Sequence, residues 1–160
     1  MTDYITLKAI KAHSPCESGW IKLLKHLEKT KADTKPLSLI TILESNGLND
    51  ALWCLRALPK ELDGKIRLFN CLIAERALQY WEKQYPDDKR PHEAIAVARK
   101  FAVGEATAKE LAAAGAARAA AGAAAGAARA AAGAAAGAAW AAAWAVEIKA
   151  QEQLFRDYWK

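Results

Sequence analysis

The sequence predicts an all-α protein, a helical bundle or array with a long Ala/Gly-rich helix near its carboxyl end. Apolar residues recur with the 3.6-residue period of a helix, and no stretch alternates with the period of a strand. Proline and glycine residues separate the periodic stretches, as expected for helix boundaries. Residues 112–145 contain 25 Ala, the strongest helix former. We therefore expect helices of about 8–20 residues joined by short links.

The expected boundaries follow from residues that begin a helix. Ser14, Asn49 and Asp63 are candidate caps, because a short polar side chain can accept a hydrogen bond from the first turn. Pro15 and Pro91 suit the first turn, where no backbone donor is needed. The expected helices cover residues 5–10, 15–27, 37–46, 50–58, 63–85 and 91–101, and a charged loop covers residues 28–35.

We expect two parts in the chain. Residues 1–104 form a helical domain, and residues 105–160 form an Ala/Gly-rich helical segment that packs on this domain or on another chain. Because alanine buries little surface, the core should come from the six tryptophans and from the Leu and Ile residues of the first hundred positions. Cys16, Cys54 and Cys71 are odd in number and lack metal-ligand spacing, so they are expected to be reduced and mostly buried.

The Ala-rich tract contains an eleven-residue repeat, GAARAAAGAAA, with about 3.67 residues per turn. The Gly, Arg and Trp residues of the tract follow one another at intervals of three or four positions, which places them on one face of a helix. These residues are Gly115, Arg118, Gly122, Gly126, Arg129, Gly133, Gly137, Trp140 and Trp144. The regular spacing favours a helix over disorder.

The length of this tract limits how it can pack. A straight helix over residues 105–158 would be about 80 Å long, whereas a compact domain of this size is roughly 40 Å across. The tract must therefore fold back at a glycine, or protrude and pair with another chain. Each interior glycine costs about 1 kcal/mol relative to alanine, so the glycines indicate a close approach by a helix or a ligand. We expect a homo-oligomer, because so long a Gly/Ala face needs a partner surface.

Residue patterns for catalysis and for metal binding are missing from the sequence. His13, His26 and His92 lie in different segments without metal-ligand spacing, and no phosphate-binding loop or GxSxG motif is present. We therefore expect no enzyme, no metal and no cofactor. Arg118 and Arg129 would each cost about 2.5–3.5 kcal/mol at a bilayer centre, so the tract is not expected to span a membrane. The expected location is the cytoplasm, because the amino-terminus lacks the apolar run of a leader.

Arginine and tryptophan on one helix face form a candidate ligand site. Arg118 and Arg129 can hold phosphate or carboxylate groups, and Trp140 and Trp144 can stack on an aromatic ring. The two arginines are about 16 Å apart on a straight helix, so a small ligand needs a folded helix, a second chain or another arginine. Arg90 is the candidate for that third cation.

Other interpretations of these residues remain open. The Gly and Trp positions could form a packing interface between helices, and residues 87–90 could simply link two helices. The net charge of +5 permits an anionic partner, but two arginines in the tract are too sparse for a nucleic-acid footprint.

Two segments and the tract together resemble a known family. The segments are NDALWCLR at residues 49–56 and YPDDKRPHEAI at residues 85–95, and TLKAIK at residues 6–11, followed by Cys16, is similar too. Together with the Ala-rich tract, they resemble the small helical putative immunity proteins of bacteria and their phages. The resemblance implies an α-helical, non-catalytic protein of a conflict system. The family's name implies blocking of a protein toxin, and its phage-borne relatives imply sequestration of a host immune signal.

The expected function is sequestration of a small anionic, nucleotide-like immune signal. Arg90, Arg118 and Arg129 would hold its phosphates, and Trp140 and Trp144 would contact its ring. The alternative is an immunity protein that binds and blocks a cognate protein toxin, in which the Ala-rich tract is a scaffold. Nucleic-acid binding is a weaker third hypothesis.

Overall fold

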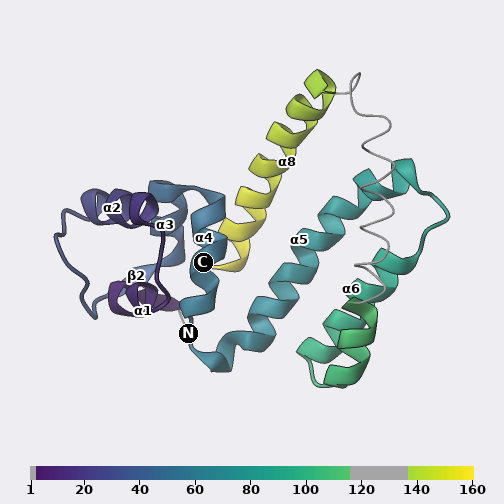
Figure 1. The fold of residues 1–160 in the computed structure, drawn as a ribbon, viewed down its shortest axis with the longest axis horizontal. Coiled ribbons are helices and arrows are strands. Elements are labelled where there is room, and N and C mark those ends of the chain that lie inside the picture. Colours follow the sequence, from purple (N-terminus) through teal and green to yellow (C-terminus); the bar gives the residue numbers. More distant parts are fainter. Residues whose placement is uncertain (1–2, 116–136) are drawn as a thin grey trace. The chain divides into compact units, whose positions relative to one another are not determined.

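The computed structural model describes residues 3–115 and 137–160, which are mostly helical, so the predicted all-α class is confirmed (Figure 1). The elements in chain order are β1 Tyr4–Thr6, α1 Leu7–Ala12, α2 Glu17–His26, β2 Pro36–Ser38, α3 Leu39–Asn46, α4 Leu48–Cys54, η1 Leu55–Ala57, η2 Lys60–Leu62, α5 Asp63–Gln84, α6 Arg90–Ala102 and α8 Gly137–Tyr158. Residues 108–115 are helical as well.

The chain divides into two compact units. The terminal unit comprises Met1–Lys60 and Ala145–Lys160, and the central unit comprises Glu61–Trp144. The expected division at residue 104 falls inside the central unit. Within the expected long helix over residues 105–158, residues 108–115 and α8 are helical, and residues 116–136 lie outside the described part.

A small antiparallel sheet corrects the expectation that the chain has no strands. β1 pairs with β2 so that Tyr4 faces Ser38, Ile5 faces Leu37 and Thr6 faces Pro36. Each strand has three residues, too few to show a period of two in the sequence. The strands therefore depend on a pairing between segments about thirty residues apart, which a local pattern does not reveal.

Several predicted helix caps are wrong, and the structure uses others. Ser14 has a positive φ of 54° and does not cap α2, which begins later, after Cys16. Gly47, rather than Asn49, precedes α4. Helices α1 and α3 are instead capped by the last residue of each strand. Thr6 Oγ1 accepts a hydrogen bond from the backbone N–H of Ala9, and Ser38 Oγ accepts one from the backbone N–H of Ile40, both at 3.1 Å. Each strand thus leads directly into a capped helix.

The core of the terminal unit consists mainly of aliphatic side chains. Its fully buried members include Ile5, Leu7, Ile10, Leu39, Ile42 and Phe155. The expectation that tryptophans supply the core is wrong for Trp20 and Trp53, which are only partly buried. Lys11 Nζ lies 5.1 Å from the ring centroid of Trp20, and the Arg56 guanidinium lies 4.5 Å from that of Trp53. Trp159, which directly follows α8, is also buried and contributes to this core.

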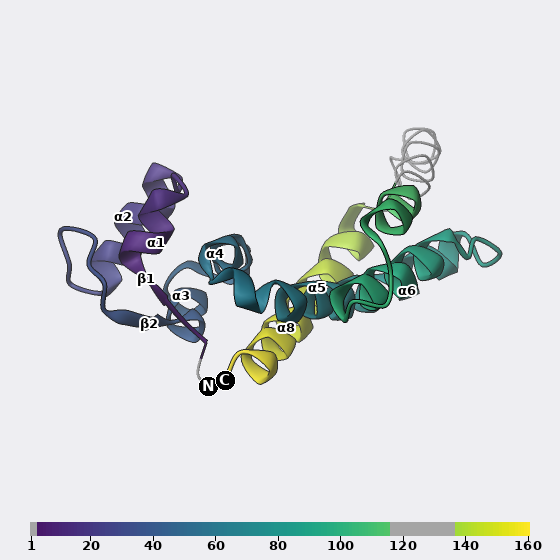
Figure 2. The same cartoon turned by 90° about the horizontal axis from the view of Figure 1, so that it is seen from below.

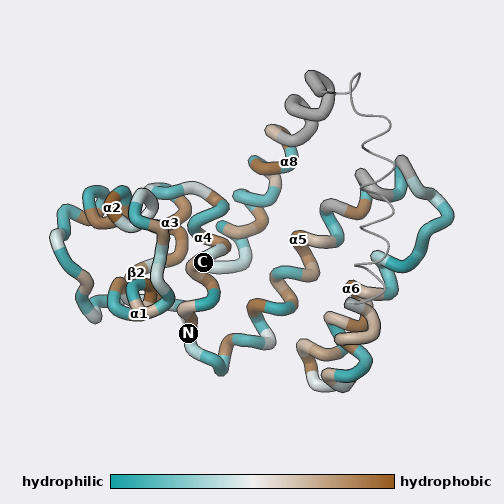
Figure 3. The backbone as a smooth tube through the Cα atoms, viewed as in Figure 1, coloured by the Kyte–Doolittle hydropathy of each residue, from teal (hydrophilic) through white to brown (hydrophobic). Residues whose placement is uncertain are grey.

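The central unit contains a helical hairpin. Helix α6 lies alongside α5 in both cartoon views (Figures 1 and 2). Hydrophobic and hydrophilic residues are interspersed along the whole length of both helices (Figure 3). The hairpin follows the predicted boundaries closely, because α5 begins at Asp63 and Pro91 lies in the first turn of α6.

Candidate functional site

The five residues predicted to hold a nucleotide are placed only in part. Arg118 and Arg129 lie outside the described residues. Trp140 and Trp144 lie on α8, four positions apart and therefore on one face of the helix, but their side chains are outside the described part. Arg90 is the first residue of α6 and is exposed. The nucleotide site stays a prediction.

The Arg90 side chain is engaged in the turn between α5 and α6. Its Nε and Nη2 donate to the two carboxylate oxygens of Asp88 at 2.8 Å and 2.9 Å, and its backbone N–H donates to Asp88 Oδ1 at 3.1 Å. These hydrogen bonds raise the pKa of Arg90, so the guanidinium stays charged. Lys89 Nζ donates to the carbonyl of Pro86 at 3.0 Å in the same turn. Arg90 therefore takes part in the turn between the two helices, and its contact with a phosphate stays a prediction.

Polar contacts fix how α6 lies against α5. In the middle of the hairpin, Arg99 donates to Glu75 from Nε at 2.7 Å and from Nη2 at 2.5 Å. Nearer the turn, Nε2 of His92 lies 2.9 Å from Oε1 of Glu82. These two pairs join α5 and α6 at different positions along the helices, which sets the register of α6 on α5.

Close packing fixes the far end of the hairpin. A Cβ built at Gly64 would lie 2.9 Å from the carbonyl oxygen of Ala102, so the two backbones approach each other directly there. The Arg67 guanidinium lies 4.9 Å from the ring centroid of Phe101, close to the same end. The hairpin is thus held at its turn, its middle and its open end, which makes α6 a preorganised platform.

A continuous exposed stripe runs along the outside of this platform. We call it the α6 outer stripe, and its members are Lys89, Glu93, Ala96, Lys100 and Val103. The intervals of four, three, four and three positions place them on one face of the helix. None of the thirteen residues of α6 is buried, and Val103 is 57% exposed. The stripe therefore combines both signs of charge with a small central residue and an exposed apolar end.

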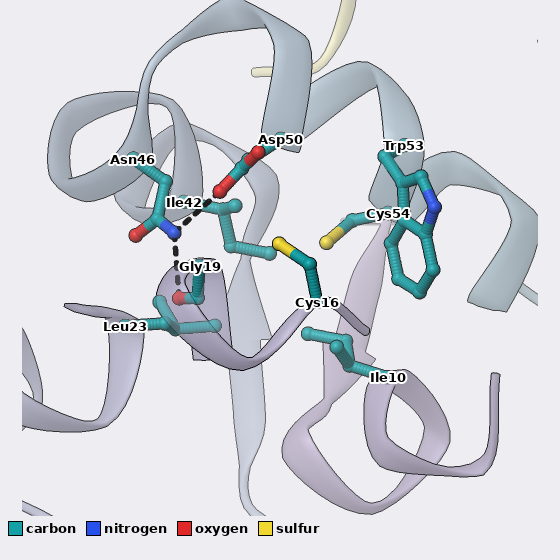
Figure 4. Close-up of a pocket in the computed structure, with 9 residues that line it drawn as sticks. All are labelled: Ile10, Cys16, Gly19, Leu23, Ile42, Asn46, Asp50, Trp53 and Cys54. Carbon is teal, nitrogen blue, oxygen red and sulfur yellow. Dashed lines mark hydrogen bonds between the residues drawn. The ribbon is translucent and has the colours of Figure 1, made fainter. Parts of the chain in front are cut away.

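A cavity of about 130 Å³ lies in the terminal unit (Figure 4). Its lining is mostly apolar, with one polar edge where Asn46 Nδ2 donates to the carbonyl of Gly19 at 2.8 Å and to Asp50 Oδ2 at 2.7 Å. Sites for cofactors and drug-sized ligands usually measure about 300–1,000 Å³. This cavity is therefore too small for a nucleotide.

Two cysteine thiols, Cys54 and Cys71, are buried. Burial, with a smaller contribution from the Asp50 charge, raises the pKa of the Cys54 thiol to about 12. Burial also raises the pKa of Cys71. Both thiols thus stay protonated at neutral pH, and a protonated thiol is a weaker nucleophile than a thiolate. Within residues 3–115 and 137–160, no group of three or more His, Cys, Asp or Glu side chains is placed to hold a metal ion.

Among residues 3–115 and 137–160, no helix combines the length and the apolar character that crossing a bilayer requires.

Neither the α6 outer stripe nor the cavity was predicted from the sequence. The 3.6-residue period predicted the apolar residues of α6, but not that the positions between them form an exposed surface. Their intervals of three and four were visible in the sequence and could have revealed the stripe. The cavity had no comparable signal, because its lining comes from four helices and the segment between α1 and α2.

Comparison with known proteins gives one match. The sequence model of a family described as Imm-5 like putative immunity protein matches residues 60–152. The matched range includes all of α5 and α6 and therefore the α6 outer stripe, whereas the cavity lies before it. No curated protein and no solved structure matches the chain.

Proposed function

The chain belongs to the Imm-5 like putative immunity protein family, and on this premise we propose that it binds and blocks a protein toxin through the α6 outer stripe. The family membership confirms the resemblance found in the sequence. Blocking a toxin requires a stable complex and no turnover, so the proposed role is non-catalytic.

The exposure of α6 carries this proposal. Helix α6 is about 20 Å long, and its outer stripe is exposed from Lys89 to Val103. A partner helix or strand can approach closely at the centre, because Ala96 has only a methyl side chain. Lys89, Glu93 and Lys100 supply charges of both signs, which contribute specificity and a faster association with a complementary partner.

The rigidity of the hairpin supports the same role. The Glu75–Arg99 pair and the Gly64–Ala102 contact hold α6 without using any member of the outer stripe. A preorganised surface loses little conformational entropy on binding, so more of the interaction free energy contributes to affinity. The expected complex therefore forms with little change in the backbone of α6.

The test is a growth-rescue assay with toxins encoded in the same genome as this chain, followed by calorimetric titration of the pair that shows rescue. Ala96→Arg places a long charged side chain at the centre of the stripe. We expect this substitution to abolish rescue and to weaken binding by at least about 30-fold, which corresponds to roughly 2 kcal/mol.

A matched control is available in the same unit. Ala113→Arg introduces the same side chain at an exposed helical position outside the stripe, and it should leave rescue and affinity unchanged. Equal binding by the Ala96→Arg protein and the unmodified chain would exclude α6 as the interface. Rescue from none of the toxins would contradict the function itself.

Sequestration of a nucleotide-like signal is the second candidate. The observation that supports it is that Trp140 and Trp144 are four positions apart in α8 and continue, in the sequence, the spacing of the repeat that contains Arg118 and Arg129. A ligand at 100 times its Kd should stabilise the chain by about 2.7 kcal/mol in a thermal-shift screen of nucleotides.

Variants separate the two candidates. Arg129→Ala should abolish the nucleotide shift and retain toxin rescue, whereas Ala96→Arg should have the opposite effects. Self-association is the remaining proposal from the sequence, and light scattering on the purified chain measures it directly. A monomer at working concentration would contradict it.

A further inference from the structure

Two cysteines from distant parts of the sequence line the cavity of the terminal unit. Cys16 immediately precedes α2, and Cys54 is the last residue of α4. Figure 4 shows the Cys54 sulfur pointing into the cavity on the side of Cys16, whose own sulfur points toward Ile42 and Asp50. Both cysteines are free thiols. The fold therefore places a pair of thiols in one small apolar space.

The contacts of Gly19 explain this placement. A Cβ built at Gly19 would lie 2.7 Å from Asp50 Oδ2 and 3.0 Å from Cys16 Sγ, so the first turn of α2 packs directly against α4. Asn46 bridges the same two helices by donating to the Gly19 carbonyl and to Asp50. Because Asp50 and Cys54 are four residues apart on α4, they share one face of that helix, which is the face that Cys16 approaches.

The two thiols differ in access to solvent. Cys16 is exposed, and its sulfur lies 3.8 Å from Ser18 Oγ. Cys54 is only 4% exposed, and its burial keeps its thiol protonated. A dissolved oxidant therefore meets Cys16 first, whereas Cys54 can react only with a group that already lies in the cavity.

We propose that Cys16 and Cys54 are a redox pair, which a peroxide converts to an intramolecular disulfide. This inference is independent of the proposed toxin binding. The Cys16 sulfur attacks one peroxide oxygen and breaks the O–O bond, which gives a sulfenic acid and one molecule of water when hydrogen peroxide is the oxidant. The Cys54 sulfur then attacks the Cys16 sulfur, and the sulfenic hydroxyl leaves with the Cys54 proton as a second water. The two thiols are oxidised by two electrons, and the peroxide is reduced.

The disulfide would join the start of α2 to the end of α4 across the cavity. Cys71 provides an internal control, because it lies on α5 in the central unit and its buried thiol donates to the carbonyl of Ile95 at 4.0 Å. It is the third cysteine of the chain and lies outside the cavity lining. The same oxidant should therefore leave Cys71 reduced.

The test treats the full chain with hydrogen peroxide and analyses it by intact-mass spectrometry and non-reducing peptide mapping. We expect a monomer lighter by two hydrogen atoms, with one peptide pair linked through Cys16 and Cys54, and reversal by dithiothreitol. Cys71→Ser should form the same link. Cys16→Ser should not form it, and this exposed substitution leaves the core unchanged.

A labelling experiment on the unmodified chain covers the case in which a Cys54 variant does not fold. Iodoacetamide should modify Cys16 before oxidation, fail to modify it afterwards, and modify it again after reduction. Links only between separate chains, or irreversible sulfinic acid at Cys16 with no loss of Cys54 thiol, would overturn the proposal.

Discussion

Arg99 holds the carboxylate of Glu75 at two points, through Nε at 2.7 Å and through Nη2 at 2.5 Å. The two residues are 24 positions apart and join the last turn of α6 to the middle of α5. Two parallel hydrogen bonds restrict the direction of approach as well as the distance. This pair therefore fixes the orientation in which α6 presents its outer stripe.

We expect a small but measurable coupling between these two side chains. Their exposures of 38% and 40% allow water and salt to screen the charges, so a double-mutant cycle with Glu75→Gln and Arg99→Gln should give about 0.5–1 kcal/mol. Urea unfolding measures each free energy of unfolding. The coupling should decrease in 1 M salt, where the Debye length is about 3 Å. No coupling at low salt would show that the pair sets geometry without stabilising the hairpin.

Gly64→Ala should destabilise the hairpin. The new methyl group would lie 2.9 Å from the Ala102 carbonyl oxygen, a backbone atom that can move only with α6. Gly115→Ala is the matched control, because Gly115 is also helical and no atom of the described residues lies within 4 Å of the added carbon. The control should stabilise the chain by about 0.5–1 kcal/mol, as alanine does in open helical positions. Thermal melts compare the stabilities of the two variants. A higher melting temperature for Gly64→Ala than for the unmodified chain would contradict the close approach of the two backbones.

Thr107 and Glu110 form a reciprocal cap at the start of helical residues 108–115. Thr107 N–H donates to Glu110 Oε2 at 2.7 Å, and Glu110 N–H donates to Thr107 Oγ1 at 3.2 Å. Thr107→Ala should cost about 1 kcal/mol of unfolding free energy. Ala113→Ser, a polar change at an exposed position of the same helical stretch, should have a smaller effect. An unchanged stability of the Thr107→Ala protein would show that the cap contributes nothing.

The same cap predicts that the stability of the folded chain depends on pH. The backbone N–H of Thr107, followed by its hydroxyl, lowers the pKa of Glu110 below its ordinary value of about 4.3. A lowered pKa in the folded state stabilises the chain above the unfolded pKa, and this contribution disappears as the pH falls through the folded pKa. Carbon-13 NMR titration of the carboxyl group should show the low value, and Thr107→Ala should raise it. An ordinary value in the unmodified chain would contradict the prediction.

Phe155 should be essential for the terminal unit. It is fully buried, although it lies near the end of the chain, and its ring is 6.3 Å from that of Trp159. Phe155→Ala should lower the free energy of unfolding by about 3–5 kcal/mol, because it leaves a cavity in the core. Val146→Ala on the same helix is the control, since Val146 is 69% exposed and its loss should have little effect. Similar effects of the two substitutions in urea unfolding would place Phe155 outside the core.

The local sequence determined much of the helical structure. Gly47, with a φ of 93°, ends α3 where the sequence predicted, and Pro91 lies in the first turn of α6 because proline is tolerated where no intrahelical donor is required. The apolar period correctly placed Cys54 and Cys71 among buried residues. These features depend on neighbours within one or two turns, so a single sequence reveals them. The YPDDKRPHEAI segment likewise led to the family.

Only the tertiary structure decided which distant residues meet. The pairing of Ile5 with Leu37, the ion pair of Glu75 with Arg99, and the cavity shared by Cys16 and Cys54 join positions that are 24 or more residues apart. Periodicity shows which face of a helix is apolar but not which element covers it, because that choice depends on the packing of the whole chain. The helices were therefore determined locally, whereas the exposure of the α6 outer stripe and the meeting of the two thiols depend on how those helices pack.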